Sequence, residues 1–181
     1  TSALGANTSG ASNTGIGREA LKTNTTAANN TAVGAEALET NNGAANTAVG
    51  KSALTSNTTG DSNVAIGKGA MELNSTGAQN TALGYNALDA NTTANNNTAI
   101  GFTAMSANTT GTQNVSVGEE SLLINTTGGQ NVAVGSEAMK ANTTGSNNVA
   151  LGRNALKGNT TAANNVALGM DTLVANTTGT R

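Results

Sequence analysis

A seventeen-residue repeat runs through the chain and constrains its fold more than any other feature. The stretch 131–147, Asn-Val-Ala-Val-Gly-Ser-Glu-Ala-Met-Lys-Ala-Asn-Thr-Thr-Gly-Ser-Asn, shows the unit. The glycine closing its Ala-Val-Gly triplet recurs at Gly17, Gly34, Gly50, Gly67, Gly84, Gly101, Gly118, Gly135, Gly152 and Gly169. Every step is seventeen residues except the sixteen from Gly34 to Gly50. Self-similarity at a fixed short period is typical of repeat architectures.

Residues 1–181 are therefore predicted to form a single repeat array rather than separate domains. With an asparagine as position one, the repeats begin at 13, 30, 46, 63, 80, 97, 114, 131, 148 and 165. The chain starts in mid-repeat and neither end has an atypical capping repeat, so we expect it to be a segment of a longer protein. The short copy lacks one residue at 41–43, which we expect to lie in a turn, where a deletion is best tolerated.

Each repeat predicts one short strand and one buried apolar side chain. Position two is Thr or Val, position three is mostly Ala, and position four is Val, Ile or Leu, as in a strand that the glycine at position five ends. Position nine is always Leu or Met, which predicts a buried ladder: Leu21, Leu38, Leu54, Met71, Leu88, Met105, Leu122, Met139, Leu156, Leu173. Charged residues concentrate at positions six, seven and ten, which predicts one solvated edge. The alanine at position three fits either a tight interior or the close approach of a neighbouring chain.

Position twelve is asparagine in every copy, and Thr-Thr usually follows it. Asparagine suits a turn because it bonds its own backbone and tolerates a positive φ, and stacked copies can bond one another. We predict a structural asparagine ladder formed by Asn24, Asn41, Asn57, Asn74, Asn91, Asn108, Asn125, Asn142 and Asn159. Strict alternation from position nine would turn this asparagine outward, whereas a bend would reset the parity.

These patterns predict an all-β fold, a β-solenoid (β-roll) of about ten 17-residue coils with one coil per repeat. Seventeen residues cannot hold two useful helices with their turns, and the density of Thr, Asn and Gly opposes helix formation. Coils stacked about 4.8 Å apart would form a rod roughly 50 Å long.

The stretch 80–93, Asn-Thr-Ala-Leu-Gly-Tyr-Asn-Ala-Leu-Asp-Ala-Asn-Thr-Thr, resembles repeats of phage tail fibres and bacterial surface proteins that carry endosialidase-type chaperone domains. More distantly, Asn-Val-Ala-Ile-Gly at 63–67 is similar to the head repeat of YadA-type trimeric autotransporter adhesins. The resemblance covers essentially the whole chain and implies a projecting shaft or head, usually of three chains, that binds surfaces. The adhesin head repeat is shorter, and this sequence contains no chaperone domain or coiled-coil stalk, so the resemblance leaves coil shape and trimerisation open.

The composition argues against catalysis. The chain has no His or Cys, which nucleophilic triads and most metal sites need, so we expect no catalytic residues, no metal site and no cofactor. A net charge of −2 gives no electrostatic footprint for nucleic acid. No apolar run is long enough to span a bilayer, so we expect no membrane insertion.

The threonines that follow the asparagine offer a sharper alternative. Their second members form a candidate surface ladder: Thr26, Thr59, Thr76, Thr93, Thr110, Thr127, Thr144, Thr161 and Thr178. Ice-binding solenoids resemble this in using ranks of Thr on a flat sheet, although ordinary β-stacking explains the same residues. Asn-Thr-Thr also matches the N-glycosylation acceptor pattern at Asn24, Asn57, Asn91, Asn108, Asn125, Asn142, Asn159 and Asn176, where turn chemistry is the favoured explanation.

We therefore expect a non-enzymatic structural or adhesive module at a cell surface, outside the cell or on a virion. The expected partners are copies of the chain, with a trimer favoured, and a surface ligand such as a glycan or a cell-surface receptor. The alternatives are an ice-binding solenoid and an extracellular filament that assembles by end-to-end stacking.

Overall fold

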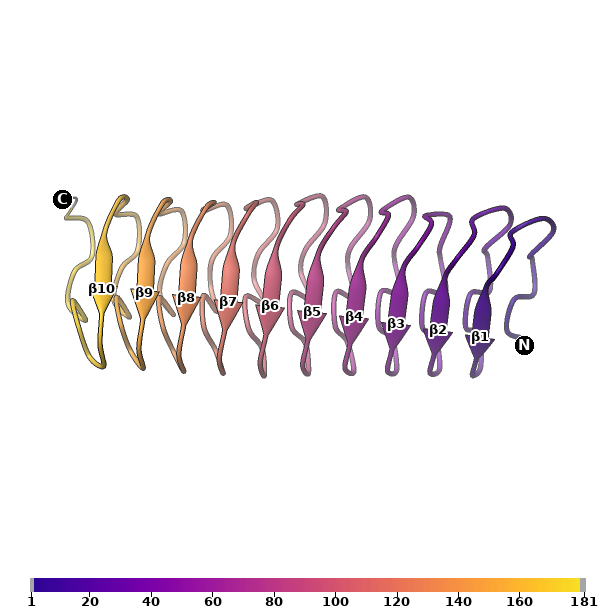
Figure 1. Ribbon diagram of the computed structural model, residues 1–181, viewed down its shortest axis with the longest axis horizontal. Helices are drawn as coiled ribbons and strands as arrows, with labels where there is room; N and C mark the ends of the chain where they lie inside the picture. Colours follow the sequence, from indigo (N-terminus) through magenta and orange to yellow (C-terminus); the bar gives the residue numbers. More distant parts are fainter. Residues whose placement is uncertain (1, 180–181) are drawn as a thin grey trace.

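The computed structural model describes residues 2–179 and confirms the β-solenoid (Figure 1). Ten three-residue strands form one parallel sheet in sequence order. They are β1 (Thr14–Ile16), β2 (Thr31–Val33), β3 (Thr47–Val49), β4 (Val64–Ile66), β5 (Thr81–Leu83), β6 (Thr98–Ile100), β7 (Val115–Val117), β8 (Val132–Val134), β9 (Val149–Leu151) and β10 (Val166–Leu168). Between residues 2 and 179 there is no helix.

Each repeat makes one coil, and equivalent positions stack on one another. The pairing runs in register, for example Thr81 with Thr98 and Ala82 with Ala99. Glycine at position five carries the chain out of the strand with a positive φ, +140° at Gly101, where an added Cβ would lie 2.5 Å from the carbonyl oxygen of Gly118. Only glycine fits this combination of backbone angle and close coil-to-coil approach.

The core is a narrow column to which each coil contributes small side chains and one large apolar side chain. The residues at positions three, eight and nine are buried in the central coils, as Ala99, Ala104 and Met105 show. The alanine at position three therefore points into its own coil, and the close approach of another chain does not explain it. The predicted apolar ladder is buried from Leu21 to Leu156. Its last member is a correction, because Leu173, in the last described coil, is 37% exposed.

The asparagine at position twelve is also inside, contrary to strict alternation. The backbone reverses earlier, because the Leu or Met at position nine has a positive φ, 53° at Met105. A turn follows in which the N–H of Asn108 donates to the carbonyl of Met105 at 3.2 Å. The asparagine itself has no positive φ, and its side chain bonds nearby backbone, as from the Nδ2 of Asn108 to the carbonyl of Gly111 at 3.0 Å. The left-handed backbone conformation at position nine interrupts the alternation of inward and outward side chains. The side chains of positions nine and twelve therefore both point into the interior.

The sixteen-residue repeat keeps the stack intact, and its missing residue lies in a bend, as predicted. This coil lacks position fourteen, so the Nδ2 of Asn41 reaches the carbonyl of Gly43 two residues on, at 2.8 Å. The strands on either side stay paired in register, Thr31 with Thr47. The deletion therefore removes one surface threonine and no interior residue.

Candidate binding surfaces

Position twelve forms a buried asparagine ladder along the whole stack. The Nδ2 of each side chain donates to the Oδ1 of the asparagine in the preceding coil, as from Asn91 to Asn74 at 2.7 Å. The same Nδ2 donates to the carbonyl of position fifteen, Ala94 at 3.1 Å. From Asn24 to Asn159 every member is fully buried. This ladder is interior and offers no surface to a ligand.

A second asparagine ladder, at position one, was missed by the sequence analysis. The backbone N–H of Asn97 donates to the Oδ1 of Asn80 at 2.9 Å, and the Nδ2 of Asn80 donates to the carbonyl of Ala94 at 2.8 Å. The two ladders therefore share the carbonyl of position fifteen as an acceptor. Asparagine begins every repeat, and this recurrence was the signal that could have revealed the ladder.

The first ladder also accounts for the Asn-Thr-Thr pattern at seven of its eight positions, all except Asn176. Attachment of a glycan needs a free Nδ2, yet from Asn24 to Asn159 this nitrogen is buried and donates two hydrogen bonds. The Asn-Thr-Thr pattern at these positions is therefore interior hydrogen-bonding chemistry.

The two threonines after the asparagine differ in their surroundings. The first donates its hydroxyl to a carbonyl of the next coil, as from Thr109 to Thr126 at 3.1 Å. The second is exposed throughout the candidate surface ladder from Thr26 to Thr178. This exposed file lies in a bend rather than on the sheet, and the short coil interrupts it.

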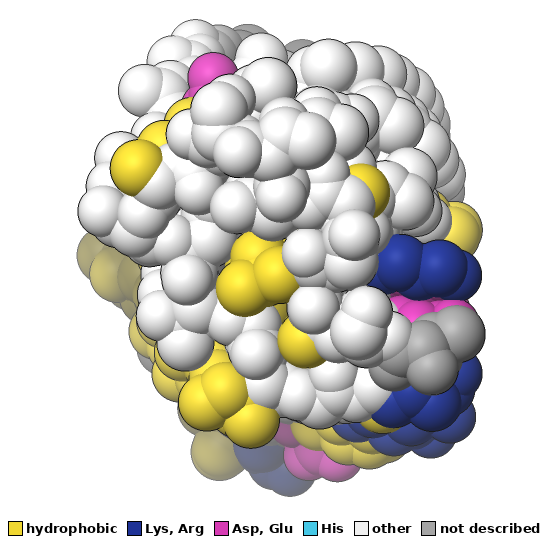
Figure 2. Space-filling view, turned by 90° about the vertical axis from the view of Figure 1, so that its right-hand side faces the viewer, with side chains coloured by type: hydrophobic (Ala, Val, Ile, Leu, Met, Phe, Trp, Pro, Cys, Tyr) yellow, Lys and Arg dark blue, Asp and Glu magenta, His cyan; other side chains and the backbone are white. Residues whose placement is uncertain are grey.

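The outward face of the sheet consists of positions two and four on either side of the buried position three. Position four is partly exposed in every strand, with exposed fractions of 43% for Leu83, 37% for Val134 and 40% for Leu151. Position two is mostly Thr from β1 to β6 and always Val from β7 to β10. Neither position holds a charged residue in any strand. We call this surface the sheet face; Figure 2 shows hydrophobic side chains along this flank and charged ones on another.

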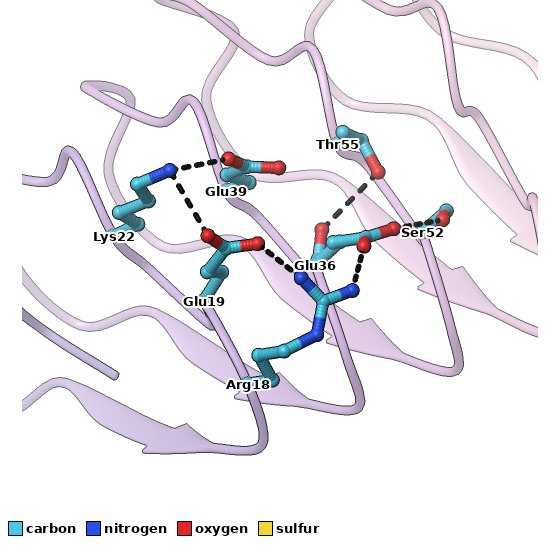
Figure 3. Close-up of polar contacts among 7 residues, drawn as sticks. All are labelled: Arg18, Glu19, Lys22, Glu36, Glu39, Ser52 and Thr55. Atoms are coloured by element: carbon cyan, nitrogen blue, oxygen red, sulfur yellow. Dashed lines mark hydrogen bonds and ion pairs between the residues drawn. The ribbon is translucent and has the colours of Figure 1, made fainter. Parts of the chain in front are cut away.

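Parts of the predicted charged edge form ion-pair clusters that join neighbouring coils. Near the N-terminal end, Arg18 pairs with Glu19 and Glu36, and Lys22 pairs with Glu19 and Glu39 (Figure 3). The hydrogen bond from Arg18, followed by that from Ser52, lowers the pKa of Glu36.

A second cluster lies toward the other end of the charged edge. Lys140 contacts Glu120 at 2.5 Å and Glu137 at 2.8 Å, and Lys157 contacts Glu137 at 2.5 Å. Hydrogen bonds from Lys140 and Lys157 lower the pKa of Glu137 to about 2. Within each cluster the acidic and basic side chains pair with one another, as expected at a solvated edge.

The only two aromatic residues stack on each other at position six of adjacent coils. The rings of Tyr85 and Phe102 lie 5.3 Å apart with an angle of 11° between their planes. They are 43% and 51% exposed, and the Nζ of Lys68 sits 5.4 Å from the centre of the Tyr85 ring. The sequence analysis did not single out this cluster, although both aromatics fall at one repeat position.

Residues 2–179 form no pocket and contain no group of three or more His, Cys, Asp or Glu side chains that could hold a metal ion. Nor does any helix in this range have the length and apolarity needed to cross a membrane. Comparisons with family models, curated proteins and solved structures gave no match.

Proposed function

We propose that this chain is a non-enzymatic structural and adhesive module, a rigid shaft or head at a cell or virion surface. The sheet face carries this proposal. Contiguous exposed apolar surface usually marks a site of interaction, and here it runs through ten strands without a charge. A file of apolar side chains extending along a rod suits lengthwise association with other rods better than capture of a small molecule.

We propose further that three chains associate through their sheet faces around a common axis. The resemblance to trimeric adhesin heads motivates the number three, and the sheet face supplies the surface that such contacts need. β-Branched and aliphatic side chains on a flat face pack well against one another. The alanine at position three makes no contribution to these contacts because it is interior.

Light scattering at several concentrations tests the association. We expect a concentration-independent mass three times that of the 17.6 kDa chain. A stable monomer would contradict the trimer, and a mass that grows with concentration would support the filament instead.

A matched pair of variants locates the interface. Val132→Glu with Val134→Glu places two charges on the sheet face of β8, and we expect this variant to be monomeric. Thr144→Glu adds a charge at an exposed position of the same repeat, away from the sheet, and should leave the mass unchanged. Equal masses for the two variants would exclude the sheet face as the interface.

Ice binding is the second candidate function, and only the exposure of the threonine file at position fourteen favours it, since the file lies in a bend and the short coil interrupts it. Replacing Thr110 with tyrosine should then abolish thermal hysteresis, whereas Ser136→Tyr, on the other side of the coil, should not. Absence of thermal hysteresis in the unmodified chain would eliminate this function.

A further inference from the structure

The middle of the position-six file differs from both of its ends. In four successive coils this position holds Lys51, Lys68, Tyr85 and Phe102. At coil spacings of about 4.8 Å the four side chains extend over about 14 Å of the rod. They lie between the two charge clusters, each of which satisfies its own charges.

In the described part of the chain the two lysines of this file make no close ion pair, and at longer range the charge of Lys51 helps to lower the pKa of Glu36. Within residues 2–179 no carboxylate lies within ion-pair distance of Lys51 or Lys68, in contrast to Lys22 and Lys140. Both residues are exposed. The ammonium of Lys68 lies against Tyr85, so cation and ring form one continuous surface.

The two rings add an exposed apolar surface at the other end of the file. Tyr85 covers one face of Phe102, and no second ring lies on its other face, because the chain has no further aromatic residue. Phe102 nevertheless remains 51% exposed. An exposed side chain of this size and apolarity is favourable where a ligand or a partner packs on it. Leu83, two residues before Tyr85, extends the apolar surface toward the sheet face.

We propose that the file from Lys51 to Phe102 binds an acidic polysaccharide that lies along the rod. Its carboxylates pair with the two ammonium groups, and one sugar ring packs its C–H groups on Phe102. The described surface has no pocket, so an extended chain that contacts several coils at once fits better than a single sugar. Glu119 follows Phe102 at position six and repels a further carboxylate, which marks the end of the site.

Single-stranded nucleic acid would also combine anions with flat rings, but the charge balance favours the polysaccharide. A nucleic acid carries a phosphate at every nucleotide and draws its affinity mainly from many cations. This site has two, in a chain with a net charge of −2.

This site names a class of ligand for the adhesive role proposed above, and the inference therefore rests on that proposed function. Calorimetric titration with polygalacturonate oligomers, and with dextran oligomers of equal length as the neutral control, tests it. The unmodified chain should bind polygalacturonate at least roughly tenfold more tightly than dextran, because close charge pairs provide discrimination of this order. Equal binding of the two polymers would overturn the site, as would tighter binding of oligo(dT) than of polygalacturonate.

Variants at exposed positions separate the site from general charge effects. Phe102→Ala should weaken polygalacturonate binding by about tenfold and Lys68→Gln by about fivefold. Arg153→Gln removes a cation from the same repeat position outside the file and should change nothing. Glu119→Gln should tighten binding about twofold, a gain that partial unfolding cannot mimic. If Arg153→Gln weakens binding as much as Lys68→Gln does, the site is wrong.

Light scattering on the same samples keeps the two proposals distinct. A trimer that fails to bind polygalacturonate contradicts the site and leaves the proposed shaft standing. A monomer that binds it through Phe102 contradicts the trimer and supports the site.

Discussion

The asparagine side of each coil and the sheet face both follow the repeat, but they differ in how strictly each position specifies its residue. On the asparagine side the same residue recurs in every repeat, because each amide must donate and accept in a fixed direction. On the sheet face the residues vary within a class, as Val33, Ile66 and Leu83 do at position four. Apolar contact is not directional, so shape and hydrophobicity suffice there.

This difference separates what holds the rod together from what the rod can contact. The amide groups of the two asparagine ladders make their hydrogen bonds within the chain, so they are not available to a partner. The sheet face and the position-six file do the reverse, with apolar area and unpaired cations turned to solvent. Substitutions on the two sides should therefore affect different measurements.

The largest loss of stability should come from breaking the buried ladder. Asn91→Ala removes donors to the Oδ1 of Asn74 and the carbonyl of Ala94, and an acceptor for Asn108 at 3.2 Å. Unsatisfied buried groups and the resulting cavity should lower the free energy of unfolding by about 3 kcal/mol. Urea denaturation followed by circular dichroism measures this loss.

Thr93→Ala is the matched control, two residues away and exposed. It should cost less than about 0.5 kcal/mol, as surface changes usually do. Similar losses for the two variants would show that the ladder is not what stabilises the coil.

An intermediate effect is expected where the interior itself departs from the repeat. In the repeat that begins at 114, serine replaces alanine at both position three and position eight, and the Oγ atoms of Ser116 and Ser121 lie 2.5 Å apart. Ser116 Oγ also donates to the carbonyl of Ser121, and Ser121 Oγ to that of Gly118.

Either single change to alanine should cost about 1 kcal/mol, whereas the double variant, which restores the pair found in other repeats, should be nearly neutral. A double-mutant cycle by urea denaturation measures the coupling. Additive losses would contradict a coupled pair.

The repeat itself made the fold predictable. The period, the strand from position two to four and the buried apolar residue at nine follow from residue types that recur at fixed spacing, and the structure confirms them. The interior asparagines could not be placed, because their orientation depends on a positive φ at Leu and Met, which these residues rarely adopt. The burial of Ala at position three shows that positions two and four form the outer surface of the sheet, an orientation that the sequence left open.

A smaller change in monomer stability is expected on the sheet face. Val132→Thr in β8 installs the residue that Thr98 supplies at the same position of β6. Because both side chains suit a partly exposed strand, the free energy of unfolding of the monomer should change by less than about 0.5 kcal/mol. Association should weaken, and light scattering at falling concentration measures the shift. A large loss of monomer stability would place this position in the core.

The smallest effect concerns the charged edge and appears only in acid. The pKa of Glu137, lowered to about 2, is below that of a free glutamate, so its ion pairs contribute stability above pH of about 4.5 and lose it as the pH falls toward 2. Glu137→Gln should flatten the fall in melting temperature between these values. Since these side chains are partly exposed, added salt should shrink the difference from the unmodified chain. Glu119→Gln, outside the cluster, should retain the original acid dependence, and a fall that survives in Glu137→Gln would assign the acid sensitivity to other carboxylates.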